Sequence, residues 1–184
     1  MQGKTDLSQF NNDWYQPGSA IKRALWYIVN VLFFINPLMP ISGLKVALLR
    51  LFGAKVGAGV VIKPVVNIKY PWKLTIGDHT WIGEKVWIDN LGVVKIGANA
   101  CLSQGSMLLC GNHNYKKAAF DLMVGDITIE DGAWIGAHSV VCPGVTCGSH
   151  SILAVNSVAT HDLEAYKIYQ GNPAQFVRNR EINT

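Results

Sequence analysis

The sequence predicts an all-β fold in which the chain winds as a parallel β-helix of about five triangular coils. An aliphatic or small apolar residue returns every six positions from residue 56 to residue 159, in five sets of three. A six-residue period is neither helical nor a plain strand alternation, so the repeating unit must turn a corner every six residues. Three flat strands per turn make a triangular prism, with successive coils about 4.8 Å apart. The fifteen positions are Val56, Ile62, Ile68, Ile76, Ile82, Ile88, Ile96, Leu102, Leu108, Ile129, Ile135, Val141, Cys147, Leu153 and Ala159.

The remaining positions of the unit fit this geometry. The residue after the aliphatic one is small or acidic at most corners, which suits a tight turn, and the fifth residue is small or β-branched and is expected to point inward. Longer spacings follow Ile68, Ile88 and Leu108, always between the third unit of one set and the first of the next. All three insertions should therefore leave the prism at one corner. The longest, residues 111–127, is predicted to be a projecting loop.

Residues 1–52 precede the repeats and are predicted to form an arm and two helices, while residues 53–184 form the β-helix domain and its tail. Ser19 is a suitable N-cap for an apolar helix over 20–35, and a second helix is expected over 43–52. Two interpretations of the first helix stay open. It packs on the prism or a neighbouring subunit, or residues 20–41 lie in a membrane interface with Trp26, Tyr27, Phe33 and Phe34 at the headgroups.

The last part of the chain leaves the six-residue period. Residues 161–169 are expected to cross the end of the prism, followed by a short terminal helix from about Gln175 and a solvated tail over 179–184. Trp81 and Trp87 occupy outward positions of their units, on one face or on adjoining faces. Burial beneath the helices or a sister subunit is favoured for both over stacking on a sugar.

Composition limits the class of partner. The net charge of +4 comes without a basic run, so nothing favours nucleic acid. Cys101, Cys110, Cys142 and Cys147 form no Cys-x-x-Cys pair, which favours free thiols in a reducing compartment over a zinc site or a disulfide. No secretion signal is apparent near residue 1. We expect a cytoplasmic protein, either free or at the inner face of the cell membrane.

Several short motifs follow one another in a fixed order across residues 50–180. They are Ile96-Gly97-Ala98-Asn99, the loop with His113, Ala133-Trp134-Ile135-Gly136-Ala137, Val141-Cys142-Pro143-Gly144-Val145, Asn156-Ser157-Val158-Ala159-Thr160 and Gly171-Asn172-Pro173-Ala174. In this order they resemble the hexapeptide-repeat O-acetyltransferases, which include maltose and galactoside acetyltransferases, and in particular the colanic acid biosynthesis branch. The resemblance implies a left-handed coil and a homotrimer with active sites between subunits, using acetyl-CoA and no metal.

Acetyl transfer from a thioester to a hydroxyl needs a base for the hydroxyl proton, a donor for the oxyanion and an acid for the departing thiolate. One histidine can be both base and acid, because an ordinary histidine pKa of about 6.5 lets either form exist at working pH. His113 opens the loop on a rigid edge, and the resemblance makes it the general base of a direct attack. His79, His138 and His150 fall at corners or outward positions, and His161 replaces a lysine that the family often has near the CoA phosphates.

The resemblance also assigns positions around acetyl-CoA and the acceptor. The backbone N–H of Ala137 would stabilise the oxyanion, and Trp134 would wall the groove. Val155 and Thr160 would line the pantetheine channel, and Arg178 would reach a CoA phosphate, while Gln175 replaces a basic residue. Gly83 falls near the place of a sugar-binding asparagine, which disfavours a simple maltose or galactoside acceptor. The acceptor candidates of the corner and the loop are Asp89, Asn90, Asn112, Asn114 and Tyr115.

Other readings of the same residues stay open. Cys110 as a covalent nucleophile is disfavoured, since direct attack needs none from the protein. A zinc hydratase uses this fold with three histidines, but Ala118 stands where that pattern wants a second one. An antibiotic acetyltransferase and a non-catalytic trimer scaffold are the remaining alternatives.

Overall fold

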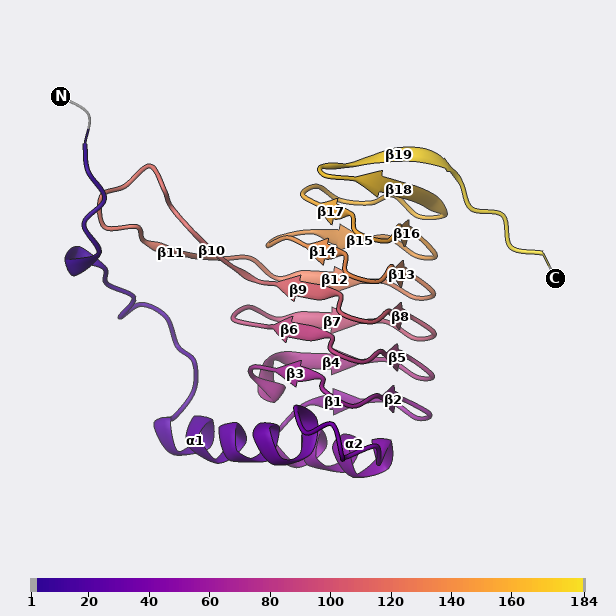
Figure 1. Ribbon diagram of the computed structural model, residues 1–184, viewed down its shortest axis with the longest axis horizontal. Coiled ribbons are helices and arrows are strands. Elements are labelled where there is room, and N and C mark those ends of the chain that lie inside the picture. Colours follow the sequence, from indigo (N-terminus) through magenta and orange to yellow (C-terminus); the bar gives the residue numbers. More distant parts are fainter. Residues whose placement is uncertain (1–2, 184) are drawn as a thin grey trace.

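The computed structural model describes residues 3–183 and confirms the predicted parallel β-helix. Each complete coil contributes one strand to each of three parallel sheets (Figure 1). Sheet 1 contains β1 (Lys55–Val56), β4 (Leu74–Ile76), β7 (Val94–Ile96), β12 (Ile127–Ile129) and β15 (Thr146–Cys147). Sheet 2 contains β2 (Val61–Ile62), β5 (Trp81–Ile82), β8 (Cys101–Leu102), β13 (Trp134–Ile135) and β16 (Ile152–Leu153). Sheet 3 contains β3 (Asn67–Ile68), β6 (Trp87–Asp89), β9 (Met107–Leu109), β14 (Val140–Val141) and β17 (Val158–Ala159).

The core of the prism consists of vertical stacks of the repeating apolar side chains. Ile62, Ile82 and Leu102 are register partners in successive coils, and all three are fully buried. Of the fifteen repeat positions only Val56, in the first coil, is partly exposed. The predicted inward residues at the fifth position are buried as well, as Thr80 and Ser106 illustrate. The six-residue pattern therefore gives each coil two inward side chains per face.

The C-terminal part differs from the prediction. The period does not end at Ala159, because Leu163 pairs with Cys147 and β18 (Lys167–Gly171) extends sheet 2 beyond β16, which makes a partial sixth coil. The expected helix from Gln175 is wrong, since β19 (Ala174–Asn179) runs back antiparallel to β18. β18 is the last parallel strand of sheet 2, so without β19 the backbone N–H and C=O groups on its outer edge would be unpaired. A returning strand forms hydrogen bonds with these groups, which an isolated helical turn would not do.

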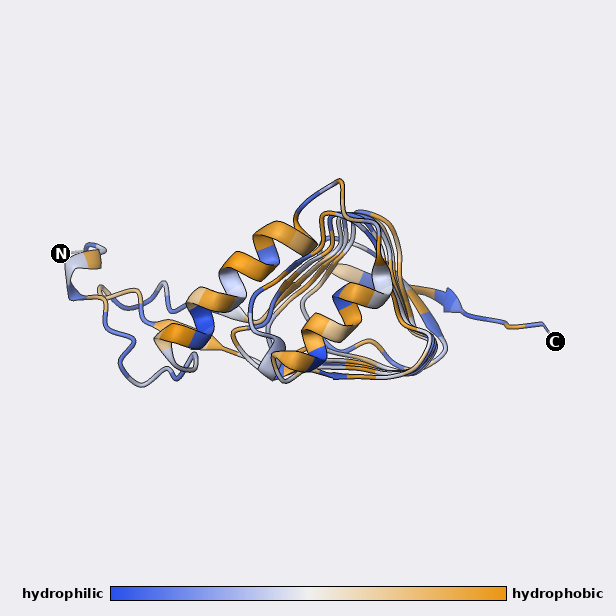
Figure 2. Ribbon diagram, turned by 90° about the horizontal axis from the view of Figure 1, so that it is seen from below, coloured by the Kyte–Doolittle hydropathy of each residue, from blue (hydrophilic) through white to orange (hydrophobic). Residues whose placement is uncertain are grey.

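Two helices lie across the end of the prism beside the first coil (Figures 1 and 2). Ser19 caps α1 (Ala20–Val29) by accepting the Lys22 N–H, as predicted, and the helix continues into the wider turn η2 (Asn30–Phe34). α2 (Ser42–Leu51) follows. The Trp26 indole N–H donates to the Ile68 carbonyl over 2.7 Å, and Phe34 is fully buried. One stripe of the first helix therefore closes the end of the core.

The insertions all connect sheet 3 to sheet 1, at the single corner that the spacing predicts. The first contains the short 3₁₀ turn η3 (Pro71–Lys73). The longest forms a β-hairpin of β10 (Gly111–His113) and β11 (Leu122–Val124), which projects from the prism (Figure 1). The N-terminal arm, with the turn η1 (Leu7–Gln9), runs beside this hairpin, where the Asp6 N–H donates to the Ala118 carbonyl over 2.8 Å.

Candidate active site

His113 ends the first strand of the projecting hairpin, and a carbonyl group and two aromatic rings lie close to its imidazole. Its Nδ1 lies 2.8 Å from the carbonyl oxygen of Phe120. A carbonyl only accepts, so Nδ1 carries a proton, and Nε2 is the nitrogen that this contact leaves unbound. The Phe120 ring stacks on the imidazole with centroids 4.4 Å apart and planes 7° apart, and Phe10 of the N-terminal arm lies 5.8 Å away. The hairpin therefore leaves Nε2 as the ring nitrogen that can meet a substrate.

The polar residues of the hairpin shape its turn. Asn114 donates its backbone N–H to Asp121, and its side-chain oxygen accepts the Lys116 N–H. The oxygen of the Asn112 side chain accepts the N–H of His113 over 2.8 Å. Tyr115 is 76% exposed at the tip. Asn112 and Asn114 thus hold the strand end in place, and their side-chain amide groups remain free to donate to a ligand.

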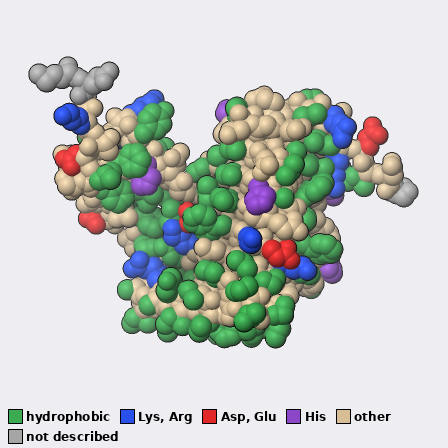
Figure 3. All heavy atoms as spheres, viewed as in Figure 1, with side chains coloured by type: hydrophobic (Ala, Val, Ile, Leu, Met, Phe, Trp, Pro, Cys, Tyr) green, Lys and Arg blue, Asp and Glu red, His purple; other side chains and the backbone are tan. Residues whose placement is uncertain are grey.

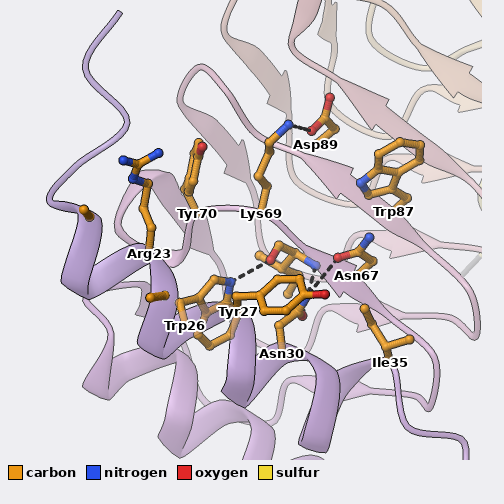
Figure 4. A pocket seen from close by; sticks show the side chains of 13 residues that line it. Arg23, Trp26, Tyr27, Asn30, Ile35, Asn67, Lys69, Tyr70, Trp87 and Asp89 are labelled. Atoms are coloured by element: carbon orange, nitrogen blue, oxygen red, sulfur yellow. Dashed lines mark hydrogen bonds and ion pairs between the residues drawn. The ribbon is translucent and has the colours of Figure 1, made fainter.

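Asp89 and Asn90 sit at the base of the hairpin but have different environments. Asp89 forms an ion pair with Lys69 at 2.9 Å and lines a cavity of about 500 Å³ between α1 and sheet 3, together with Trp87 and Arg23 (Figure 4). Asn90 is fully buried, accepts the Tyr70 N–H over 2.9 Å and donates to the Tyr70 carbonyl over 2.6 Å. Asn90 therefore ties two insertions together, and its amide is not presented to an acceptor.

A second group of candidates lies on sheet 2. Trp134 donates its indole N–H to Ser103 over 2.8 Å and stays 44% exposed. It shares a hollow of about 670 Å³ with Arg178 on β19. Ala137 follows β13 at the next corner, where no group within residues 3–183 accepts its backbone N–H. Val155, one coil further on, is 57% exposed.

Thr160 belongs to the other side of the molecule. It lines a cavity of about 370 Å³ at the base of the hairpin together with Asn112 and Cys142, and its hydroxyl lies 2.9 Å from Nδ1 of His161. The hairpin and the strands β13 and β16 lie on opposite sides of the prism (Figure 1). One copy of the chain therefore brings Asn112, the residue before His113, and Thr160 into one cavity but leaves Trp134 and Arg178 on the other side.

Trp81 and Trp87, which were expected to be buried beneath the helices or a sister subunit, are exposed to solvent in the single chain. Trp81 lies on sheet 2 and Trp87 on sheet 3, so they occupy adjoining faces. Trp81 is 61% exposed and Trp87 39% exposed. The helices approach Trp87 only across the cavity beside α1 and do not cover Trp81.

The cysteines are poorly suited to nucleophilic attack. The four cysteines all lie within the described residues and are free. Burial raises the pKa of the Cys110 thiol to about 11 and that of Cys147 to about 12. A thiol that keeps its proton at neutral pH is a weak nucleophile, which agrees with a direct attack on the substrate.

Among residues 3–183 no group of three or more His, Cys, Asp or Glu side chains is arranged to hold a metal ion.

Solved structures with the same architecture define the class of protein. A hexapeptide-repeat acetyltransferase of Vibrio cholerae O1 biovar eltor, complexed with acetyl coenzyme A, superposes with a TM-score of 0.80 over 91% of this chain and 93% of that chain, at 24% identity. A galactoside acetyltransferase in complex with coenzyme A has a TM-score of 0.77 and 25% identity, covering 88% of this chain and 82% of that chain. The fold is therefore that of the hexapeptide-repeat acetyltransferases.

A sequence relative places the chain within this class. A protein of Escherichia coli (strain K12) named as a colanic acid biosynthesis acetyltransferase, WcaF, is 39% identical over 176 residues, which span 95% of this chain and 97% of the relative. No family model matches the chain. The chain belongs to the hexapeptide-repeat acetyltransferase family, with WcaF as a relative over nearly its full length, and the predicted resemblance is confirmed.

Proposed function

We propose that this acetyltransferase moves an acetyl group from acetyl-CoA to a hydroxyl of a saccharide that serves as an exopolysaccharide precursor. The observation that carries the proposal is the orientation of His113, whose Nδ1–H is committed to the Phe120 carbonyl. The free Nε2 lone pair is the base that the reaction needs. The names of WcaF and of the galactoside acetyltransferase support a saccharide acceptor, and the coenzyme A complexes support the donor.

We propose the following course for the reaction. Nε2 of His113 takes the proton of the acceptor hydroxyl while that oxygen forms a bond to the thioester carbonyl carbon. The carbonyl oxygen becomes an oxyanion, which the Ala137 N–H stabilises. When the C–S bond breaks, the imidazolium returns its proton to the sulfur of CoA. No covalent intermediate with the protein forms.

Assembly between copies completes this site. His113 and Trp134 lie on opposite sides of one chain, so we propose a homotrimer in which the hairpin of one subunit meets sheet 2 of the next. Trp134 and Val155 would border the pantetheine arm from sheet 2, with Thr160 bordering it from the hairpin side, and Arg178 would contact a CoA phosphate. On the acceptor side Asp89, Asn112, Asn114 and Tyr115 would contact the saccharide. Asn90 would not, because its amide groups are already bound.

We also propose a location for the enzyme in the cell. We expect a cytoplasmic enzyme that acts at the inner face of the cell membrane on a lipid-linked saccharide. Within the described chain no helix has both the length and the apolar character needed to cross a bilayer.

The proposal is tested by following thiol release from acetyl-CoA against a panel of free saccharides, undecaprenyl-linked oligosaccharides and acetyl-accepting antibiotics. The expected result is release with a saccharide acceptor and a loss of about 10²- to 10⁴-fold in His113→Ala. His79→Asn is the matched control, because Asn99 occupies the equivalent corner with a similar positive φ of 54°. Full activity in His113→Ala, or turnover of the antibiotics alone, contradicts the assignment. Sedimentation velocity of the same preparations tests the trimer.

A further inference from the structure

The first helix has a second apolar stripe that nothing within residues 3–183 covers. Ile21, Leu25, Ile28 and Leu32 recur at helical spacing on the side facing away from the prism, and each is more than half exposed. The opposite stripe, with Trp26 and Phe34, is buried. A surface helix of a globular domain normally places polar residues on its outer side, so a second apolar stripe needs a partner.

The apolar surface continues beyond this helix. Leu38 is 85% exposed, Ile41 57% and Leu51 77%, and all three lie in or beside α2 at the same end of the prism. Figure 2 shows both helices largely in the hydrophobic colour when seen from this end, and Figure 3 shows hydrophobic side chains along the whole lower edge. We call this surface, formed by residues 21–51 of the two helices and their connection, the end face.

The charged residues around the end face are all of one sign, positive. Residues 14–77 contain eight lysines and arginines and no aspartate or glutamate, whereas the whole chain has 16 and 12. The modest net charge of the chain therefore conceals a cationic end and an acidic remainder. Arg23, Arg50, Lys55 and Lys63 are exposed on the helices or on the first coil above them.

This combination selects the partner. We infer that the end face docks on a bilayer surface that contains anionic lipid, with the apolar side chains at the level of the acyl boundary and the surrounding cations among the headgroups. Apolar contact and attraction to anionic headgroups together are the signals that hold an interfacial helix on a membrane. A second copy is a poor partner, because two such faces would bring like charges together.

The docked orientation suits a flat surface. The two helices lie side by side across one end of the prism (Figure 2), so the end face is presented perpendicular to the stack of coils. In a cyclic trimer with parallel prisms, the three end faces would point the same way and bind one membrane together, which strengthens attachment without new contacts. The docking itself does not depend on the proposed acetyl transfer.

Binding of the full chain to vesicles tests this inference. We expect cosedimentation with vesicles of mixed phosphatidylcholine and phosphatidylglycerol, weaker binding to phosphatidylcholine alone, and release as the salt concentration rises. Leu38→Gln with Leu51→Gln should weaken binding about tenfold or more, since both leucines are exposed and each loses its lipid contact. Val177→Gln, an exposed apolar change on β19 at the far end, should leave binding unchanged.

A matched pair of charge variants tests the electrostatic part. Lys55 and Lys95 occupy the same outward column of sheet 1, each paired with Thr75, but only Lys55 borders the end face. Lys55→Gln should weaken binding to the anionic vesicles about fivefold, and Lys95→Gln should not. The Leu38 and Leu51 variant should keep the wild-type melting temperature and its thiol-release activity on a free saccharide, which separates docking from catalysis.

Three results would overturn the inference. One is the absence of vesicle binding by the wild-type protein at either composition. Another is binding that the end-face variants and their controls share equally. The third is a wild-type assembly twice the size of the assembly that the Leu38 and Leu51 variant forms. The end face would then be covered by a second copy.

Discussion

The stacking of Phe120 on His113 makes a sharp prediction about catalysis. Phe120→Ala removes the ring that lies 4.4 Å from the imidazole, while the backbone carbonyl that accepts the Nδ1–H remains. The tautomer is therefore kept and only the orientation of the ring is loosened. Stacked aromatic pairs contribute about 0.5 to 1.5 kcal/mol beyond burial, which corresponds to a fall in kcat of about two- to tenfold if the orientation is used in the transition state.

Steady-state thiol release at varied acetyl-CoA and acceptor concentrations measures this effect. We expect kcat to fall while the KM for acetyl-CoA stays near the wild-type value, because Phe120 orients the base and lies on the hairpin rather than on sheet 2. Phe120→Tyr keeps a ring of the same shape and should restore kcat. An unchanged kcat in Phe120→Ala, or a rise in the acetyl-CoA KM alone, would refute the positioning role.

Further predictions concern the donor groove, the thiols and the core. Trp134→Ala should raise the KM for acetyl-CoA more than it lowers kcat, whereas Trp81→Ala, on the same sheet two coils earlier, should change neither. Cys110→Ala should keep most activity, and mass spectrometry should find Cys110 unmodified by iodoacetamide at neutral pH. Because the folded protein holds the Cys110 proton to a pKa of about 11 and the unfolded chain releases it near 9.0, the unfolding free energy should fall as the pH rises above 9.0. Leu102→Ala should lower the unfolding free energy in urea by about 2 to 5 kcal/mol, and an unaltered midpoint would contradict the stacked core.

The coil architecture could be predicted because every coil repeats the same physical constraint. An inward side chain such as Ile82 lies directly above Ile62 and below Leu102, so the same residue type recurs at a fixed spacing. The corner of the insertions followed from their place in the period, and all three do connect sheet 3 to sheet 1. The spacing in the sequence predicts the coils because each coil packs only on its neighbours, and the same contacts recur from one coil to the next.

The errors fall where contacts between distant segments replace the period. Gln175 and its neighbours become a strand because β18 offers an open edge, and the edge is not visible in the local sequence. Asn90 looked like an exposed corner residue, but the insertion around Tyr70 folds over it and takes both of its hydrogen-bonding groups. The support of His113 by Phe120 was not predicted either, although an aromatic residue seven positions after the histidine was a usable signal.

The two ends of the prism are closed by different elements, and this closure determines whether molecules can associate end to end. In a stack of parallel coils, the strands of the last coil have unpaired edges to which the strands of another chain could be added. The helices close the first coil, and β19 covers the exposed edge of β18 by running in the opposite direction. Truncation before Ala174 would uncover that edge, and we would then expect filaments or amorphous aggregates in place of discrete particles.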